Sequence, residues 1–474
     1  MRFLIFFILF SLQTHALTFK SDGTVVDNDG NLIDQTNQDQ SNQNSTGSYN
    51  LNFKTNFHIG EAYVNNLGDM NGDNTDDFLL SLMVDPSAYG AQFYDIDKEM
   101  AGQLPRVPSY LVYSNDDGKY SYEALPEETW SKRMWAVEGF KIDDRSFILL
   151  GRNGEVGKPE ENPGEKIAVV EVDFENTKPE FINIFFEEYN TVTAAVEKFE
   201  NKDGEVLLAI SNYSIIQKRP HTKYGVYDSI IYKFDPDAGL SYSDLTPYTK
   251  DKIAHNGYRV LDLDSDSKLD FLGGTEVWKS HDKDAKPISL DIGSYIVLDW
   301  FNNNEFKSIK LKPKFDLDHA GFDVNIANVN NDNYVLETSG KFLGHWADNP
   351  FQDAALSIYK FIQPKKSFSS VDIYQFFDLG LARATQSKTF TYDFDKDGED
   401  EIFINNYMKN RKYFDFLGDE WVETPLKYSL ISNSRNQMIT SVLLENNDEN
   451  CAILASTYLY QKTKTVKLHI SDCL

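Results

Sequence analysis

An acidic loop followed by an apolar, strand-like run recurs along this 474-residue chain, and it constrains the fold more than any other feature. The three clearest copies begin at Asp69, Asp262 and Asp393. In each copy, oxygen-bearing side chains stand at positions 1, 3, 5 and 9 of the loop, and the apolar run follows directly. Self-similarity along a chain is the signature of repeat architectures. The sequence therefore indicates a series of units, each built round one such loop.

The spacing within these loops suits a hard divalent cation. A tight loop turns alternate side chains inward, and a backbone carbonyl near position 7 together with the acid at position 9 can complete an oxygen cage. Ca²⁺ takes about six to eight oxygens. The predicted ligands are Asp69, Asn71, Asp73 and Asp77 in the first loop, Asp262, Asp264, Asp266 and Asp270 in the second, and Asp393, Asp395, Asp397 and Glu401 in the third. The alternative, an acidic surface turn, explains one loop more readily than three.

An EF-hand is excluded, because that motif needs Glu at position 12. The sequence has Leu80, Gly273 and Ile404 there, each inside an apolar run.

Degenerate copies extend the series to seven units, whose loops start near residues 69, 140, 199, 262, 328, 393 and 444. Of the degenerate copies, the one with Asn328, Asn330 and Asp332 keeps the most oxygen ligands, so we expect it to hold metal weakly. Turns flanked by alternating aromatic and β-branched residues, as in 110–122 and 230–242, follow in step and indicate hairpins. Four antiparallel strands repeated seven times predict an all-β fold, a seven-bladed β-propeller.

The two ends of the repeat region agree with a closed ring. The seventh unit has only three strand-like runs, and residues 49–54 form a further run before the first unit. We expect this N-terminal strand to complete the last blade and close the propeller. Cys451 and Cys473 flank a turn at 461–464, so a hairpin there would bring them within reach of a disulfide. Two unpaired thiols are the alternative.

The three best loops resemble the calcium loops of FG-GAP/VCBS repeats, which form the propeller of integrin α-subunit heads and of many secreted bacterial proteins. The resemblance extends over about residues 51–474. It implies calcium in the loops between the first and second strands of each blade, on one face of the propeller. It also implies a ligand-binding face on the opposite side, formed by the loops between the second and third strands. The candidate ligand-binding residues in those loops are His221, Tyr224, Trp278, His281, His345, Trp346 and Arg411.

The N-terminus predicts export from the cytoplasm. Residues 1–16 combine a basic start, an apolar stretch and small residues before a cleavage point, as in a secretory signal peptide. A buried N-terminal strand is the alternative. Residues 17–48 form a polar linker rich in Asn and Gln, and the propeller occupies residues 49–474. We therefore expect a secreted or periplasmic protein.

The charge balance narrows the classes of binding partner that the protein can have. With 46 Lys+Arg against 74 Asp+Glu, the formal net charge is −28, which opposes binding to nucleic acid or to anionic membranes. No later run of apolar residues is long enough to insert the mature chain into a membrane, and we expect a monomer.

For function, our first hypothesis is a binding or adhesion module for a carbohydrate or protein ligand, and we favour this over an enzyme. The first alternative is a lyase-like polysaccharide-active enzyme with a His/Arg/Tyr site. The second is a structural component of the cell envelope.

Overall fold

The computed structural model of the chain describes residues 18–19, 25–26, 49–90, 102–115, 118–153, 164–176, 178–191, 193–201, 203–212, 228–242, 254–276, 295–297, 308–311, 319–342, 351–362, 367–376, 388–393, 397–405, 412–424, 437–438, 441–447, 451–460 and 463–473. The chain divides into two compact units, residues 1–41 and 42–474. In the first unit, β1 (Thr18–Phe19) pairs with β2 (Val25–Val26). The predicted signal peptide, 1–16, and most of the predicted linker, 17–48, lie outside the described residues. Within the described part of the chain, no helix has the length and apolar character of a membrane span.

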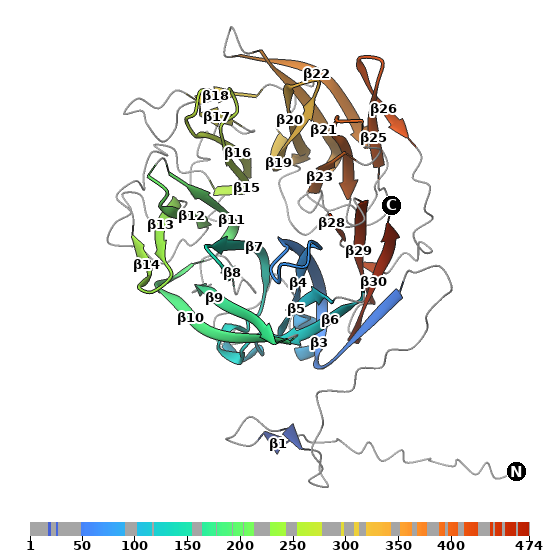
Figure 1. Cartoon of the computed structure of the whole chain (residues 1–474). Coiled ribbons are helices and arrows are strands. Elements are labelled where there is room, and N and C mark those ends of the chain that lie inside the picture. The colour runs from blue at the N-terminus through green and yellow to red at the C-terminus, as the bar shows by residue number, and fades with distance from the viewer. Residues whose placement is uncertain are drawn as a thin grey trace, which may run out of the picture. The chain divides into compact units, whose positions relative to one another are not determined.

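The second unit consists of antiparallel β-sheets, so the predicted all-β class is confirmed. Figure 1 shows these sheets following one another in chain order. Among the described residues, five sheets have four strands each, paired in the order in which the chain makes them. The first of these sheets comprises β7 (Met134–Ile142), β8 (Arg145–Arg152), β9 (Glu165–Asn176) and β10 (Lys178–Thr191), and the second comprises β11 (Thr193–Glu200), β12 (Val206–Asn212), β13 (Asp228–Asp235) and β14 (Gly239–Tyr242). The third comprises β15 (Ala254–Leu261), β16 (Asp270–Glu276), β17 (Tyr295–Val297) and β18 (Ser308–Lys310), and the fourth comprises β19 (His319–Val329), β20 (Asp332–Phe342), β21 (Phe351–Ile362) and β22 (Ser367–Phe376). The fifth comprises β23 (Lys388–Tyr392), β24 (Glu401–Asn405), β25 (Lys412–Leu417) and β26 (Glu420–Thr424).

The long strand β3 (Tyr49–Gly68) joins the first and last strands of this unit. Its first part, residues 49–54, pairs with β30 (Thr463–Cys473), and its second part, from Ile59 onward, pairs with β4 (Asp77–Val84). Beyond β4 lie β5 (Ser109–Ser114) and β6 (Tyr120–Ala124); beyond β30 lie β29 (Cys451–Tyr460) and then β28 (Ser441–Asn446) and β27 (Gln437–Met438), which both pair with β29. One strand therefore belongs to both the first and the last group of strands.

The hydrophobic core lies between neighbouring sheets. One cluster joins Leu79 on β4 to Ile148 on β8, and another joins Leu149 on β8 to Leu208 on β12. Each of these four side chains is completely buried. Similar clusters join the sheet of β19–β22 to that of β23–β26, and Phe403 on β24 to the strands β28 and β29. Since burying such a side chain stabilises by about 1.5–3 kcal/mol, the sheets are held to one another mainly by these apolar layers.

Carboxylates on the first strand of a sheet add a polar link to the next sheet. Each accepts a hydrogen bond from a backbone N–H of the following sheet's first strand. The pairs are Glu138 with Lys198 at 2.7 Å, Glu197 with Val260 at 3.3 Å and Asp323 with Thr389 at 2.9 Å. Arg259 on β15 lies beside Glu197, with 3.6 Å from Nη1 to Oε2. Burial raises the pKa of Glu197 to about 7, although Arg259 opposes the rise.

Candidate functional site

Among the residues that the structure describes, the three predicted cation loops share the same backbone hydrogen bonds to their first residue. They span residues 69–76, 262–269 and 393–400, between strand pairs β3–β4, β15–β16 and β23–β24. In each loop the carboxylate at position 1 accepts hydrogen bonds from the N–H groups of positions 5 and 6. The distances are 3.2 and 3.0 Å at Asp69, 3.0 and 2.8 Å at Asp262, and 3.1 and 2.9 Å at Asp393. Position 6 has a positive φ in all three, at Asn74, Ser267 and Gly398. The repeated spacing in the sequence therefore corresponds to a repeated structure.

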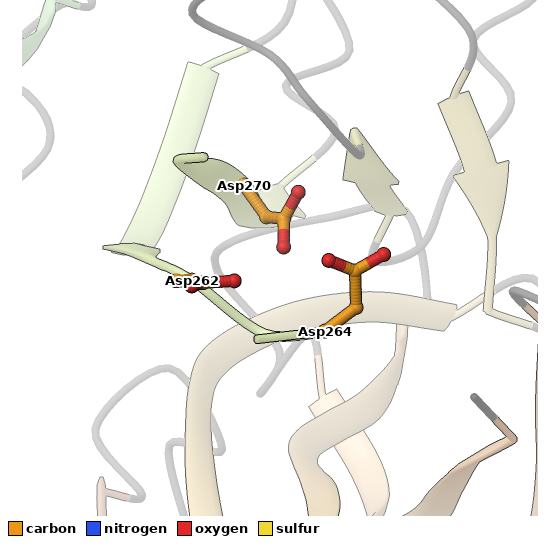
Figure 2. Close-up of side chains that lie close together, drawn as sticks. All are labelled: Asp262, Asp264 and Asp270. Carbon is orange, nitrogen blue, oxygen red and sulfur yellow. The ribbon is translucent and has the colours of Figure 1, made fainter. Parts of the chain in front are cut away.

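The second loop gathers three carboxylates. Asp262, Asp264 and Asp270 each place an oxygen within 4.8 Å of the others, and Figure 2 shows the three side chains converging. Asp264 is 2% exposed and Asp270 is completely buried. Burying two carboxylates side by side is costly unless a positive charge compensates them. This donor set is one that Ca²⁺ accepts. The predicted ligand Asp266 lies in the same loop, where its side chain pairs with Lys268 at 2.9 Å.

The third loop gathers three carboxylates from positions 1, 5 and 9, where the second loop uses positions 1, 3 and 9. The oxygens of Asp393, Asp397 and Glu401 also lie within 4.8 Å of one another. Glu401, at position 9 like Asp270, is 1% exposed. Asp395 lies outside the described residues.

In the first loop, the hydroxyl of Ser114 lies among the predicted ligands. Its Oγ is 2.7 Å from Oδ2 of Asp73, 3.2 Å from Oδ1 of Asp77 and 3.4 Å from the carbonyl oxygen of Thr75. A hydroxyl donates one proton, so it cannot satisfy three acceptors at once. Burial raises the pKa of Asp77 to about 8, and the negative charges of Asp73 and Asp69 add to the rise. Asn71 completes the group, with its Nδ2 at 2.9 Å from the carbonyl oxygen of Ser114. The loop therefore brings together several oxygens, and a cation among them would be more favourable than the single hydroxyl proton of Ser114.

Two of the degenerate units have tight turns in place of the long loop. β19 ends at Val329 and β20 begins at Asp332, so only Asn330 and Asn331 connect them, both with positive φ. The predicted weak ligand Asp332 forms an ion pair with Lys360, and Asn328 donates its backbone N–H to Asp400 at 2.7 Å. Asp143, which has a positive φ, and Asp144 connect β7 to β8.

Position 8 of the loop has a role that the sequence reasoning missed. Asp76 and Asp400 stand at this position, and each carboxylate accepts a backbone N–H from another unit: Asp76 from the last unit of the chain and Asp400 from the unit before its own. Asp76 accepts the N–H of Glu445 at 2.8 Å, and Asp400 accepts that of Asn328. The recurrence of an acid at position 8 in two loops was a visible signal. No sequence signal pointed to the contact of Ser114 with the first loop, because Ser114 lies on β5, far from the loop in the sequence.

The opposite ends of these strands carry a group of basic side chains. β4 starts at the first cation loop and ends at Val84, whose N–H donates to the carbonyl of Lys132 at 3.2 Å. We call Arg106, Lys132, Arg133 and Arg152 the basic cluster. Arg106 Nε lies 2.8 Å from Oε1 of Glu165, and Arg152 Nε lies 3.9 Å from Oε2 of the same carboxylate. Arg133 lies 3.8 Å from Glu61.

Aromatic side chains lie next to the basic cluster. Trp130 packs edge-on against Phe57, with 6.2 Å between ring centroids, and its carbonyl accepts a hydrogen bond from Arg152. Tyr89, which is 40% exposed, packs edge-on against His58. The predicted ligand-binding residues, His221, Tyr224, Trp278, His281, His345, Trp346 and Arg411, lie outside the described residues.

The predicted disulfide involves two neighbouring strands. Cys451, which forms a disulfide, begins β29, and Cys473 ends β30. The register of these antiparallel strands places Cys473 opposite Ile453, two residues from Cys451.

The second unit thus defines a protein of antiparallel sheets packed face to face, with acidic loops at one end of the strands and a basic, aromatic group at the other. No family model matches the chain, and none of the curated proteins matches it. Several solved structures are similar. BBS1N, solved in complex with ARL6DN, has 9% identity and a TM-score of 0.44, covering 89% of this chain and 95% of that one.

Two other similar structures are enzymes by their titles. The polysaccharide lyase Uly1 has 10% identity and a TM-score of 0.43, covering 91% of this chain and 94% of that one. The α-L-arabinofuranosidase Arb93A from Fusarium graminearum has 11% identity and a TM-score of 0.41, covering 71% of this chain and 92% of that one. The sequence led us to favour a binding module over an enzyme, and this preference is corrected here, because carbohydrate-active enzymes are among the structures similar to this chain. These names describe those proteins.

Proposed function

We propose that this protein is an exported, calcium-binding, seven-bladed β-propeller that acts as an enzyme on a polysaccharide. The observation that carries the proposal is the set of hydrogen bonds shared by the loops at 69–76, 262–269 and 393–400, in each of which the carboxylate at position 1 accepts the N–H groups of positions 5 and 6. In the second and third of these loops three carboxylates also lie within 4.8 Å of one another. Calcium would be held by these carboxylates. It would supply positive charge that fixes the loops, and with them the strand ends on either side.

The blade count follows from treating the two parts of β3 separately. Its second part and β4–β6 make one group of four strands, and its first part and β28–β30 make another. With the five four-stranded sheets this gives seven blades, the last completed by the N-terminal strand. A disulfide from Cys451 to Cys473 would fix the same closing blade, and the neighbouring positions of β29 and β30 support it.

The polysaccharide-binding face would lie at the end of the strands away from the cation loops. Aromatic side chains suit stacking on sugar rings, and Trp130, Phe57 and the exposed Tyr89 lie on this face. His221, His281, His345 and Arg411 are our candidates for the catalytic groups, since the sequence assigns them to the long connections between the second and third strands of their blades.

Two measurements test the proposal. Thermal unfolding in Ca²⁺ and in chelator tests the metal sites, and we expect a higher midpoint with Ca²⁺. A glycan array, followed by an assay of chain cleavage on each polysaccharide that binds, tests the activity. Binding without cleavage by the intact protein would contradict the enzymatic part. An identical midpoint with and without Ca²⁺ would contradict the metal part.

A further inference from the structure

Ser114 brings a strand outside the first cation loop into contact with that loop. The residue ends β5 and is 3% exposed. Its N–H donates to Oδ1 of Asp77 at 2.9 Å, and its carbonyl accepts a hydrogen bond from Nδ2 of Asn71 at the same distance. Its Oγ lies 2.9 and 2.7 Å from the two carboxylate oxygens of Asp73. The backbone and the side chain of one residue on β5 therefore contact positions 3, 5 and 9 of the loop.

The hydroxyl of Ser114 has the properties of a cation ligand. Positions 1, 3, 5, 7 and 9 of the loop offer five ligand residues, whereas Ca²⁺ takes about six to eight oxygens. The Oγ of Ser114 also lies 3.4 Å from the carbonyl oxygen of Thr75, which is the backbone group of position 7. A hydroxyl has two lone pairs besides its proton, so it can turn them toward a cation among these acceptors. Because it is neutral, it adds an oxygen without adding negative charge to the Asp residues at positions 1, 5 and 9.

The same loop is paired with the last repeat unit, through the end of β28. An antiparallel bridge joins Thr75 to Asn446. On one side of the bridge, the N–H of Asn447 donates to the carbonyl of Asn74 at 2.8 Å. On the other side, the N–H of Asp76 donates to the last unit at 2.8 Å, and its carboxylate accepts an N–H from that unit at 2.8 Å. Thr75 therefore offers its carbonyl to the ligand set from the middle of this bridge, and a cation that fixes Thr75 also fixes the segment that pairs with the last unit.

The second loop differs at the corresponding place. Its position 8 is Leu269, which has no side-chain acceptor for a neighbouring unit. Its triad of Asp262, Asp264 and Asp270 comes from the loop and from the first residue of β16. A cation in the second loop would fix that loop, whereas a cation in the first loop would in addition fix β5 and the last unit.

Building on the calcium binding in the proposed function, we infer that Ser114 is a further ligand for calcium in the first loop, and that calcium bound there holds the last repeat unit against the first. Ser114 supplies a neutral oxygen from β5, and the carbonyl of Thr75 connects the cation to the bridge with Asn446. Removal of calcium therefore loosens the pairing of residues 74–76 with residues 445–447. Loss of the Ser114 hydroxyl has the same effect in the presence of calcium.

Hydrogen–deuterium exchange of the full chain, in Ca²⁺ and in chelator, tests this through peptides that cover residues 441–447 and 262–270. At 100 times the dissociation constant, an opening that releases the cation should become up to about 100-fold rarer. We therefore expect exchange in 441–447 to slow in Ca²⁺ by at least about tenfold. Ser114→Ala should lose most of this slowing. The slowing in 262–270, which reports on the second loop, should remain and shows that the variant is folded.

Ser109→Ala is the matched control. Ser109 begins β5 and is also 3% exposed, yet it lies at the other end of the strand from the loop. This variant should respond to Ca²⁺ like the unaltered protein. Equal slowing in 441–447 for the Ser114→Ala and Ser109→Ala variants, or slowing confined to 262–270 in the unaltered protein, would overturn the inference and leave calcium binding standing. If Ca²⁺ slows exchange in none of the three loops, the metal part of the proposed function is defeated as well.

Discussion

The carboxylate of Asp76 accepts a hydrogen bond from the backbone N–H of Glu445 at 2.8 Å, although 369 residues separate the two in the sequence. The return bond, from the N–H of Asp76 to the carbonyl of Glu445, is also 2.8 Å. Asn66 reinforces the contact, because its Nδ2 donates to Asp76 at 2.7 Å and to the carbonyl of Leu443 at 3.2 Å. The first cation loop is thereby joined to the last unit of the chain.

Replacing Asp76 by Ala should weaken this junction. The substitution removes the acceptor of two hydrogen bonds in a residue that is 7% exposed. The backbone N–H of Glu445 then loses this acceptor, and the Asn66 amide keeps only the carbonyl of Leu443. Such a loss costs about 1–3 kcal/mol. Denaturant unfolding followed by tryptophan fluorescence would measure it as a lower midpoint. Glu420→Ala, at an exposed position of β26, is the control and should leave the midpoint unchanged.

Asp264→Asn should reduce the stabilisation by Ca²⁺. The unaltered protein at 100 times the dissociation constant should gain about 2.7 kcal/mol per site. The Asn variant loses one charge of the second loop's triad, so its gain should be smaller. In chelator its midpoint should equal or exceed that of the unaltered protein, since the buried negative charge is gone. Asp419→Asn, in the exposed turn after β25, is the control; an equal Ca²⁺ response in both variants would count against the site.

Glu197 should make the protein less stable as the pH rises. Burial raises its folded-state pKa from 4.5 to about 7, so the folded state binds the proton more tightly than the unfolded chain. Its stabilising contribution is therefore complete below pH 4.5 and is lost as the pH rises through 7. The charged groups around it are Arg259, Glu138 and Asp323.

Glu197→Gln removes the titrating group and should flatten this pH dependence, with a gain of roughly 1–3 kcal/mol at pH 8 relative to the unaltered protein. Midpoints of chemical unfolding between pH 4 and 8 would measure it. A steeper decline in the variant than in the unaltered protein would be the opposite of what the burial predicts.

Gly139→Ala should destabilise the contact between β3 and β7. A Cβ atom at Gly139 would lie 2.2 Å from the carbonyl oxygen of Leu67 and 2.7 Å from its Cα, so a backbone would have to move. Overpacking of this kind costs about 1–3 kcal/mol. Gly102→Ala is the matched control, because a Cβ there meets nothing within 4 Å. A lower thermal midpoint for the first variant alone is the expected result.

The all-β class and the three loops were predictable from the sequence because their signals are local. Carboxylates at positions 1, 3, 5 and 9 are close along the chain, and the hydrogen bonds from positions 5 and 6 to Asp262 depend on that loop alone. The local sequence did not determine the structure of the degenerate copy at Asn328. Whether it forms a long loop or a tight turn depended on the pairing of β19 with β20, which brings Val329 opposite Asp332.

The sequence by itself determined the all-β class and the acid positions in the loops, since each depends on residues a few places apart. Only the tertiary structure decided which distant groups meet. It placed Ser114 among the ligands of the first loop, Asp76 against Glu445, and Arg106 against Glu165. The physical reason is that these contacts form where separate sheets pack, and packing depends on how whole apolar faces fit together, which no single segment encodes.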